Sequence, residues 1–369
     1  MKRLFIAALC LLQLSLCACS NDMNRRELDE INLIHIMGID YSDGMYVLTA
    51  VFSSGQGADP EKNPSGSEDV SEGKGATPFE AFQDLKLKNK KTVSIANTGY
   101  FLIGETAAAE GIETCLDFLS RDETVKMESL VFITQGVNAS YFISEGMKNG
   151  KMIHEDLEAV EQKLHELVTR IDNTLVNILN EMEDDLSGLL IPYLKTGEDS
   201  FNIGGYAVFD GLSLADYLDI DTSAGINIIK NIMRTYPIYL KKGVSLSVSS
   251  LKSRMKTELE EGLVWVDIHV DFESMVREVN TDEDIFRVEE QNTLTRLQNA
   301  YIEDILKKAV DYSKDTGRDI LNIGRIIRNR YAKEWSGIRD EWKDMVPDIQ
   351  YELHVRSRIA KSFILGNRR

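Results

Sequence analysis

Residues 264–272 read Val-Trp-Val-Asp-Ile-His-Val-Asp-Phe, and this strict alternation of apolar and polar side chains decides the fold of the second half of the chain. Successive side chains of a β-strand point to opposite faces, so every second residue from Val264 to Phe272 shares one face and His269 lies on the other. A strand with one buried and one solvated face is typical of antiparallel sheets. The stretch therefore predicts a half-exposed strand of such a sheet.

Neighbouring stretches fit the same sheet. Residues 349–356 alternate in the same way, and residues 244–248 read Val-Ser-Leu-Ser-Val. Residues 284–312 have helical periodicity instead, with an apolar stripe formed by Leu294, Leu297, Tyr301, Ile305 and Ala309. We expect this long helix to lie across the apolar face of the sheet.

The second half is therefore predicted to be an α+β domain over residues 199–369, with an antiparallel sheet packed by a long helix. Short helices are expected at residues 320–331 and 335–345, before the last strand. A further division of this domain into residues 199–260 and 261–369 stays open.

The first half alternates between helices and strands. Two apolar runs at residues 31–40 and 45–52 flank an Asp-Gly pair, which predicts a buried hairpin. Residues 53–77 are rich in Gly, Ser, Pro and acidic side chains, and they are predicted to form a mobile loop. Strands and helices then follow at residues 78–88, 99–103, 106–120, 130–134, 139–147 and 155–184. This pattern predicts an alternating α/β domain over residues 19–198, and an α+β multidomain protein as a whole.

The first residues resemble a bacterial lipoprotein signal. Lys2 and Arg3 precede an apolar run, and residues 16–19 read Leu-Cys-Ala-Cys, the pattern of a lipobox. The run is shorter than the roughly 17 to 25 residues that span a bilayer. We expect cleavage to remove residues 1–18 and Cys19 to become an N-palmitoyl, S-diacylglycerol cysteine. The chain would then be anchored to the outer leaflet of the cytoplasmic membrane.

Charge and cysteine content limit the partners and the chemistry. The chain has 60 acidic and 42 basic residues, a net charge of −18, which disfavours nucleic acid and anionic lipid as partners. Only Cys115 remains if Cys10 and Cys17 leave with the signal and Cys19 carries lipid, so no intramolecular disulfide is expected, as is compatible with the outside of a Gram-positive cell. We interpret Cys115 as a small buried helix residue rather than a nucleophile.

No motif indicates catalysis, a cofactor or a metal. His154 and His165 are each followed by Glu, but neither has the second histidine of a zinc protease helix, so both are expected to be exposed helix residues. His269 and His354 lie on the polar faces of two predicted strands, where they can be neighbours without a ligand. Residues 66–75 depart from the spacing of a phosphate-binding loop. We therefore expect a protein that is not an enzyme, with no cofactor and no metal site.

Ordered motifs in both halves resemble the Ger(x)C family, the lipoprotein subunits of nutrient germinant receptors in endospore-forming bacteria. They include residues 36–40 (Ile-Met-Gly-Ile-Asp), residues 204–209 (Gly-Gly-Tyr-Ala-Val-Phe) and residues 319–324 (Asp-Ile-Leu-Asn-Ile-Gly). Trp335 and Trp342 follow, seven residues apart, and are expected to pack on one helix face against the last strand.

The resemblance implies a non-enzymatic receptor subunit in the spore inner membrane, beside membrane-embedded A- and B-type subunits. Its implied role is receptor assembly or signal coupling when nutrients such as amino acids or sugars trigger germination; direct nutrient binding stays open. The alternative is a solute-binding lipoprotein of a membrane transport system, which has a similar anchor and length. That class needs two α/β lobes around a cleft, and the α+β pattern of the second half argues against it.

Overall fold

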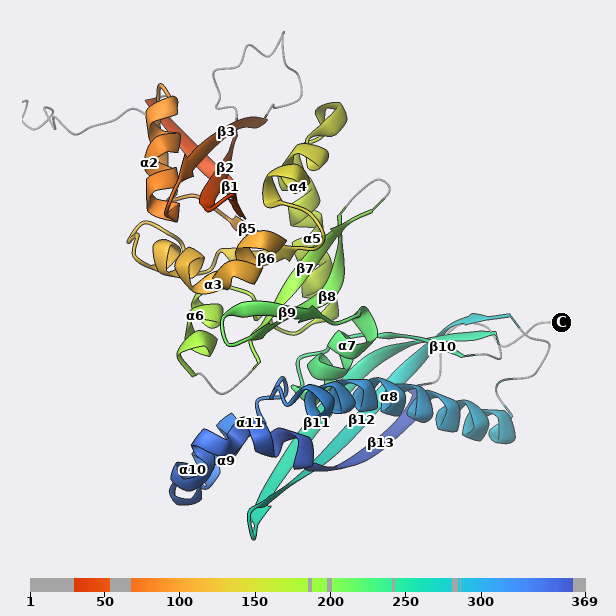
Figure 1. Cartoon of the computed structure of the whole chain (residues 1–369). Helices are drawn as coiled ribbons and strands as arrows, with labels where there is room; N and C mark the ends of the chain where they lie inside the picture. The colour runs from red at the N-terminus through yellow and green to blue at the C-terminus, as the bar shows by residue number, and fades with distance from the viewer. Residues whose placement is uncertain are drawn as a thin grey trace, which may run out of the picture.

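The computed structural model describes residues 30–53, 68–184, 188–197, 201–240, 243–280, 285 and 287–360. Its strands form a nine-stranded sheet in the order β3-β2-β1-β5-β6-β7-β8-β9, with β4 beside β1, and a four-stranded sheet in the order β10-β11-β12-β13. Figure 1 shows the first sheet with its helices above the second sheet. The predicted α+β multidomain class is confirmed.

The first sheet begins with the predicted hairpin. Strands β1 (Ile31–Ser42) and β2 (Met45–Ser53) pair antiparallel. Asp43 and Gly44 both have positive φ angles, 53° and 76°, as the tight turn between such strands requires.

The prediction of a mobile loop at residues 53–77 was wrong for residues 68–75, and residues 54–67 lie outside the described residues. Strand β3 (Glu68–Gly75) pairs antiparallel with β2. The glycines that suggested a loop are instead required by close packing. A Cβ on Gly73 would lie 2.1 Å from the backbone of Ala81, and a Cβ on Gly75 would lie 2.3 Å from it. They let helix α2 (Pro78–Lys88) pack directly on the strand.

The alternating part of the first half follows the expected order. Strands β1, β5, β6 and β7 run parallel, and β5 and β6 are buried along their whole length. The elements are β4 (Thr92–Ser94), β5 (Tyr100–Gly104), α3 (Glu105–Ser120), β6 (Leu130–Thr134), α4 (Ala139–Gly146), a 3-10 turn (Lys148–Gly150), α5 (Ile153–Leu167), α6 (Leu175–Asp184) and β7 (Leu190–Thr196).

The single long helical stretch expected at residues 155–184 is divided in the structure. Helix α5 ends at Leu167, and α6 begins at Leu175. Between them, Val168 forms a β-bridge with Met233, and Thr174 forms one with Leu130. These tertiary hydrogen bonds replace the helical ones at this point. Local periodicity could not reveal them, because their partners are distant in the sequence.

The first sheet continues past the expected domain boundary at residues 198/199. Strands β8 (Phe201–Asp210) and β9 (Ser213–Tyr217) extend it, and β8 pairs antiparallel with β7. This boundary therefore does not separate the two sheets. The chain passes to the second sheet only after helix α7 (Ile220–Ile229).

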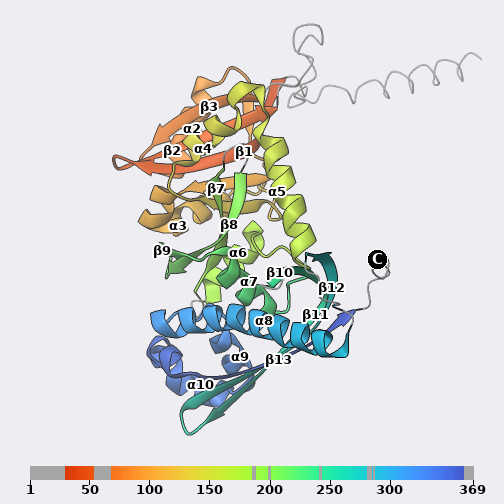
Figure 2. The ribbon, with the colours of Figure 1, turned by 90° about the vertical axis from the view of Figure 1, so that its right-hand side faces the viewer.

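The second sheet is built on a long antiparallel hairpin of β11 (Val244–Glu260) and β12 (Leu263–Val279), with β10 (Pro237–Leu240) beside β11. Helix α8 (Val288–Thr316) runs along its apolar face, as predicted (Figure 2). Leu297 of the predicted stripe is exposed, and Ile302 and Leu306 are buried in its place. The chain then forms α9 (Ile323–Arg330), α10 (Ala332–Ile338), a 3-10 turn (Arg339–Glu341), α11 (Trp342–Met345), a second 3-10 turn (Val346–Asp348) and β13 (Gln350–Ala360).

The second sheet is mixed rather than wholly antiparallel, which corrects the prediction for its last strand. Strand β13 pairs parallel with β12, from Trp265 opposite Gln350 to Met275 opposite Ala360. The long connection through α8 to α11 allows this, because parallel neighbours need a crossover of a dozen residues or more. Side-chain alternation is the same in both pairings and could not distinguish them.

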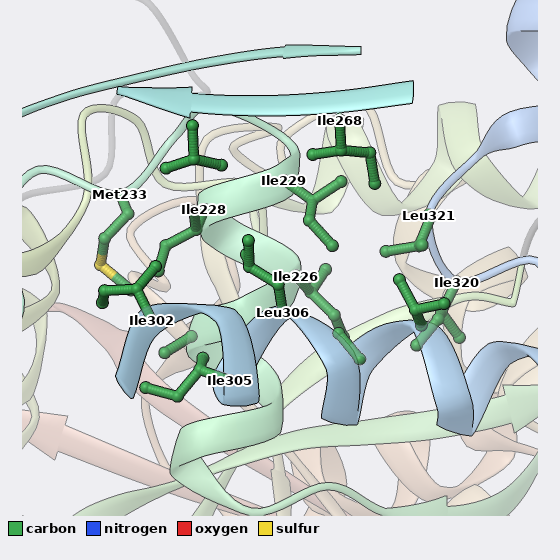
Figure 3. Packing of buried hydrophobic residues seen from close by; sticks show 14 of the residues in the cluster. Ile226, Ile228, Ile229, Met233, Ile268, Ile302, Ile305, Leu306, Ile320 and Leu321 are labelled. Atoms are coloured by element: carbon green, nitrogen blue, oxygen red, sulfur yellow. The ribbon is translucent and has the colours of Figure 1, made fainter. Parts of the chain in front are cut away.

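Helix α7 joins the two sheets through one apolar core. Ile226, Ile228 and Ile229 of α7 lie among Ile305 and Leu306 of α8 and the inner face of the second sheet (Figure 3). The same cluster reaches β7 and β8 of the first sheet. Residues 223–229 are all buried, and a helix that is buried on every side is expected at such a central position.

Candidate functional site

The helix pair α7 and α8 forms the centre of the junction between the sheets. A Cβ added to Gly225 would lie 2.4 Å from the carbonyl oxygen of Ile305, so the glycine lets the two helices approach closely. Tyr206 of β8 donates a hydrogen bond to Asn227 Oδ1 of α7 at 2.8 Å. The close contact between the helices and this hydrogen bond together connect the first sheet, α7 and α8 into one packed unit.

A cavity of about 500 Å³ opens beside this junction. Its walls come from both sheets and from helices α5, α7 and α8, and they include Leu164, Val168, Ile203, Ala224, Met233 and Tyr301. Most of this lining is apolar or aromatic, which is typical of pockets that hold small molecules or apolar side chains.

Several polar groups of the cavity are paired with protein groups. Tyr236 donates a hydrogen bond to Asp221 Oδ1 at 2.7 Å, and Lys308 lies 3.1 Å from Asp221 Oδ2. Burial raises the pKa of Tyr206 to about 12 and also raises the pKa of Tyr236, so both phenols stay protonated. The cavity therefore suits an apolar occupant better than a sugar or a zwitterion. Its residues are scattered along the chain, and only Gly205 and Tyr206 among them belong to a motif noted in the sequence, residues 204–209.

The 319–324 motif is a buried helix cap. The Asp319 carboxylate accepts hydrogen bonds from the backbone N–H groups of Ile323 (2.8 Å) and Gly324 (2.6 Å), and from Trp342 Nε1 (3.1 Å). Burial raises the pKa of Asp319, and the three hydrogen bonds partly oppose this rise. A Cβ on Gly324 would lie 2.6 Å from Trp342 Nε1, so the motif glycine makes room for the indole. The motif residues stabilise the fold and are not exposed for chemistry.

Trp335 and Trp342 pack together, but not on one continuous helix as predicted. Their rings meet edge to face at 5.3 Å, and both are buried in the core on which Tyr351 and Leu353 of β13 pack. The helix is interrupted by the 3-10 turn at Arg339–Glu341, and Trp342 begins α11. The interruption turns the second indole toward Asp319.

The 36–40 motif contains a second buried cap. Asp40 at the end of β1 accepts hydrogen bonds from the N–H groups of Ala139 (2.7 Å) and Ser140 (2.9 Å) at the start of α4. Burial raises its pKa, because the charged form loses its hydration. A Cβ on Gly104 would lie 1.9 Å from Asp40 Oδ1, so this glycine leaves space for the carboxylate.

The histidines of α5 and those of the second sheet differ in their surroundings. His154 and His165 lie on α5 and pair with Glu158 (3.1 Å) and Glu161 (3.6 Å). His165 is exposed as predicted, whereas His154 is partly buried, with its ring 5.7 Å from that of His35. The rings of His269 and His354 stack at 4.5 Å, which confirms that the two residues are neighbours.

Cys115 is fully buried on α3, and burial raises the pKa of its thiol to about 12. This agrees with the interpretation of a core residue, because a thiol that stays protonated is a poor nucleophile. Cys19 lies outside the described residues, so its lipidation remains a prediction. Among the described residues, no helix is long and apolar enough to cross a bilayer.

Comparisons with known proteins match both halves of the chain. Residues 24–196 match the model of the spore germination protein N-terminal domain, and residues 204–362 match that of the spore germination B3/GerAC-like C-terminal domain. The crystal structure of the GerBC protein has a similar fold, with a TM-score of 0.60 and 17% sequence identity over 88% of this chain and 97% of that chain. No curated protein matches the chain.

Proposed function

This chain belongs to the family of GerAC- and GerBC-like spore germination proteins, the C subunits of germinant receptors, and from this premise we propose that it is a lipid-anchored, non-enzymatic receptor subunit. The observation that carries the proposal is the match of the family's two domains, in order, to residues 24–196 and 204–362. The subunit acts in assembly of the receptor or in coupling of the nutrient signal.

The packing of the two sheets supports a coupling role. The core cluster around α7 includes residues of both sheets, and close-packed interiors transmit displacement instead of absorbing it. A partner bound to one sheet can therefore influence a partner bound to the other. The buried positions of Asp40 and Asp319 fit this role, because these motif carboxylates stabilise the body and are not available to a substrate.

The proposed partners are the membrane-embedded A- and B-type subunits of the receptor, and Cys19 is the proposed anchor. Lipid on Cys19 would hold the body at the outer leaflet of the spore inner membrane, where those subunits are exposed. The acidic character of the chain favours contact with proteins over contact with anionic lipid.

Replacement of Cys19 tests the anchor and the function together. In purified spores, Cys19→Ala should release the chain from the inner-membrane fraction and slow nutrient-triggered germination. Cys17→Ala is the matched control, because it changes a cysteine two residues away that is not the proposed lipid carrier. If deletion of the whole gene leaves germination unaltered, with no paralogue to replace it, the proposed function is wrong.

Cross-linking in intact spore membranes tests the partners. Exposed positions on the first and second sheets would carry the cross-linker in separate variants. Capture of A- or B-type subunits by either set supports the proposal. Capture of transporter subunits alone would support the solute-binding alternative.

One observation favours the solute-binding alternative, namely the cavity of about 500 Å³ beside α7. The two sheets of this chain differ in size and construction, so the structure lacks the two similar lobes of solute-binding proteins. Calorimetry with amino acids and sugars distinguishes the functions. Tight binding of either solute class by the purified chain would favour solute binding. We expect none, because the lining is mostly apolar and two of its polar pairs, Tyr206 with Asn227 and Tyr236 with Asp221, are already hydrogen-bonded.

A further inference from the structure

The solvated face of the second sheet gathers a cluster of metal-ligating side chains. Strands β12 and β13 pair parallel, with His269 opposite His354 and Asp267 opposite Glu352. All four residues lie on the same side of the sheet, since they alternate with the buried residues of their strands. The pairing brings together residues that are distant in the sequence.

The potential ligand atoms in this cluster converge. One atom each from Asp267, His269 and His354 lies within 4.8 Å of the other two. His269 Nε2 is 2.9 Å from Asp267 Oδ2, and His354 Nε2 is 3.3 Å from Asp267 Oδ1. The two imidazole rings stack with their centroids 4.5 Å apart and their planes 16° apart, so they lie side by side.

These separations are close to those of a tetrahedral zinc site. Zinc binds histidine nitrogen at about 2.0–2.1 Å, which puts neighbouring ligands of a tetrahedron about 3.3 Å apart. Glu352 Oε1 lies 3.3 Å from His354 Nε2 and offers a further oxygen. Imidazole and carboxylate together favour borderline divalent metals such as Zn²⁺, Ni²⁺ or Cu²⁺.

One oxygen of Asp267 lacks a hydrogen bond in the described part of the chain. Asp267 Oδ1 is inaccessible to solvent, and His354 Nε2, 3.3 Å away, does not meet it in hydrogen-bond geometry. A buried carboxylate oxygen without a hydrogen bond is costly. The nearby cations of β11 make their ion pairs elsewhere: Arg254 pairs with Asp271 at 3.0 Å, and Lys256, which lies opposite Asp267 in the sheet, pairs with Glu258 at 2.6 Å.

We propose that Asp267, His269 and His354 bind one divalent transition-metal ion, with Glu352 as an additional oxygen ligand. The site joins the edge strand β13 to β12 from the solvated side, opposite α8. The histidine side chains are 44% and 36% exposed, so an ion can enter from solvent and keep a water ligand. This inference is independent of the receptor function proposed above.

Zinc titration of the full chain in detergent tests the site. The background carries Cys10→Ser, Cys17→Ser and Cys19→Ser, because free thiols near the N-terminus would themselves bind zinc. A chelator competition should give one saturable Zn²⁺ site per chain. His269→Gln and His354→Gln should each weaken it by at least about a hundredfold, since loss of a direct ligand exceeds the 10–100-fold cost of losing an outer partner.

A matched control is His165→Gln. His165 is also exposed and lies beside a carboxylate, but among the described residues no second histidine converges on it. This variant should bind zinc as the parent does. The midpoint of thermal unfolding should rise with Zn²⁺ in the parent and in His165→Gln, but not in His269→Gln. Co²⁺ in place of zinc should give the intense visible absorption of a tetrahedral nitrogen and oxygen site.

Two results would overturn the inference. Saturable binding that persists in the His269→Gln, His354→Gln double variant would mean that the ion binds elsewhere. An absence of saturable binding by the parent would mean that Asp267 only accepts hydrogen bonds from its neighbouring imidazoles. The variants retain stacking side chains of similar size on a solvated face, so failure to fold does not obscure either result.

Discussion

Replacement of Asp319 tests whether the 319–324 motif is a structural cap. Asp319→Ala removes the acceptor of three hydrogen bonds, from the N–H groups of Ile323 and Gly324 and from the Trp342 indole. Each buried donor left unpaired costs about 1–3 kcal/mol. Removal of the desolvated carboxylate returns part of this cost, so we expect a loss of about 3–5 kcal/mol in the free energy of unfolding.

Urea unfolding followed by tryptophan fluorescence measures this loss, because Trp335 and Trp342 lie beside the motif. Asp319→Asn is the milder variant, since it keeps one acceptor oxygen and the side-chain volume. Its expected cost is about 1–3 kcal/mol. Asp340→Ala, an exposed acid of the same region, is the control and should stay within about 0.5 kcal/mol of the parent.

The pH dependence provides a second measurement of the same carboxyl group. Burial holds the folded pKa of Asp319 above its unfolded value, which is near 3.9 for a free aspartate. The folded state therefore binds the proton more tightly, and the resulting stability is fully present below the unfolded pKa and lost as pH rises through the folded pKa. As the pH rises from the unfolded pKa of Asp319 through its folded pKa, the parent should lose stability relative to Asp319→Asn. An Asp319→Ala loss below about 0.5 kcal/mol, or a parent that gains on Asp319→Asn with rising pH, would refute the reasoning.

Other changes have expected outcomes that similar measurements check. Gly225→Ala should cost about 1–3 kcal/mol in denaturant unfolding, because the new methyl group would lie 2.4 Å from the Ile305 carbonyl. Gly337→Ala is the control on open helix surface and should stabilise the protein by up to about 1 kcal/mol. Equal effects of both variants would contradict close packing of α7 on α8. Asp40→Ala should lower the free energy of unfolding by about 1–3 kcal/mol, as two N–H groups of α4 lose their acceptor, and an unchanged value would exclude a capping role. In a background whose other cysteines are serine, Cys115 should resist a thiol reagent at pH 8 until the protein is unfolded, and rapid modification of the native protein would contradict its burial and its pKa of about 12.

Sequence reasoning was most successful where the signal is local. The hairpin around Asp43, the strand at 130–134 and the helix after Pro78 were all predicted, because turn chemistry and side-chain periodicity act over a few residues. It failed at β3, where glycines required by packing against α2 resembled those of a loop.

The candidate sites were less accessible to sequence reasoning. The cavity beside α7 has lining residues from several elements of both halves, without a shared motif. The motif carboxylates Asp40 and Asp319 were visible in the sequence as parts of family patterns, but their capping role depends on partners in α4 and α11 that local spacing does not identify.

The alternating stretch at residues 264–272 determined by itself that this segment is a strand with one apolar face, and the stripe at residues 284–312 determined that a helix would cover that face. Only the tertiary structure decided that β13 runs parallel to β12 and that β8 and β9 complete the first sheet. The physical reason is that alternation sets which face a side chain occupies, whereas strand order and direction depend on the path of the connections. That path alone brings His354 beside His269.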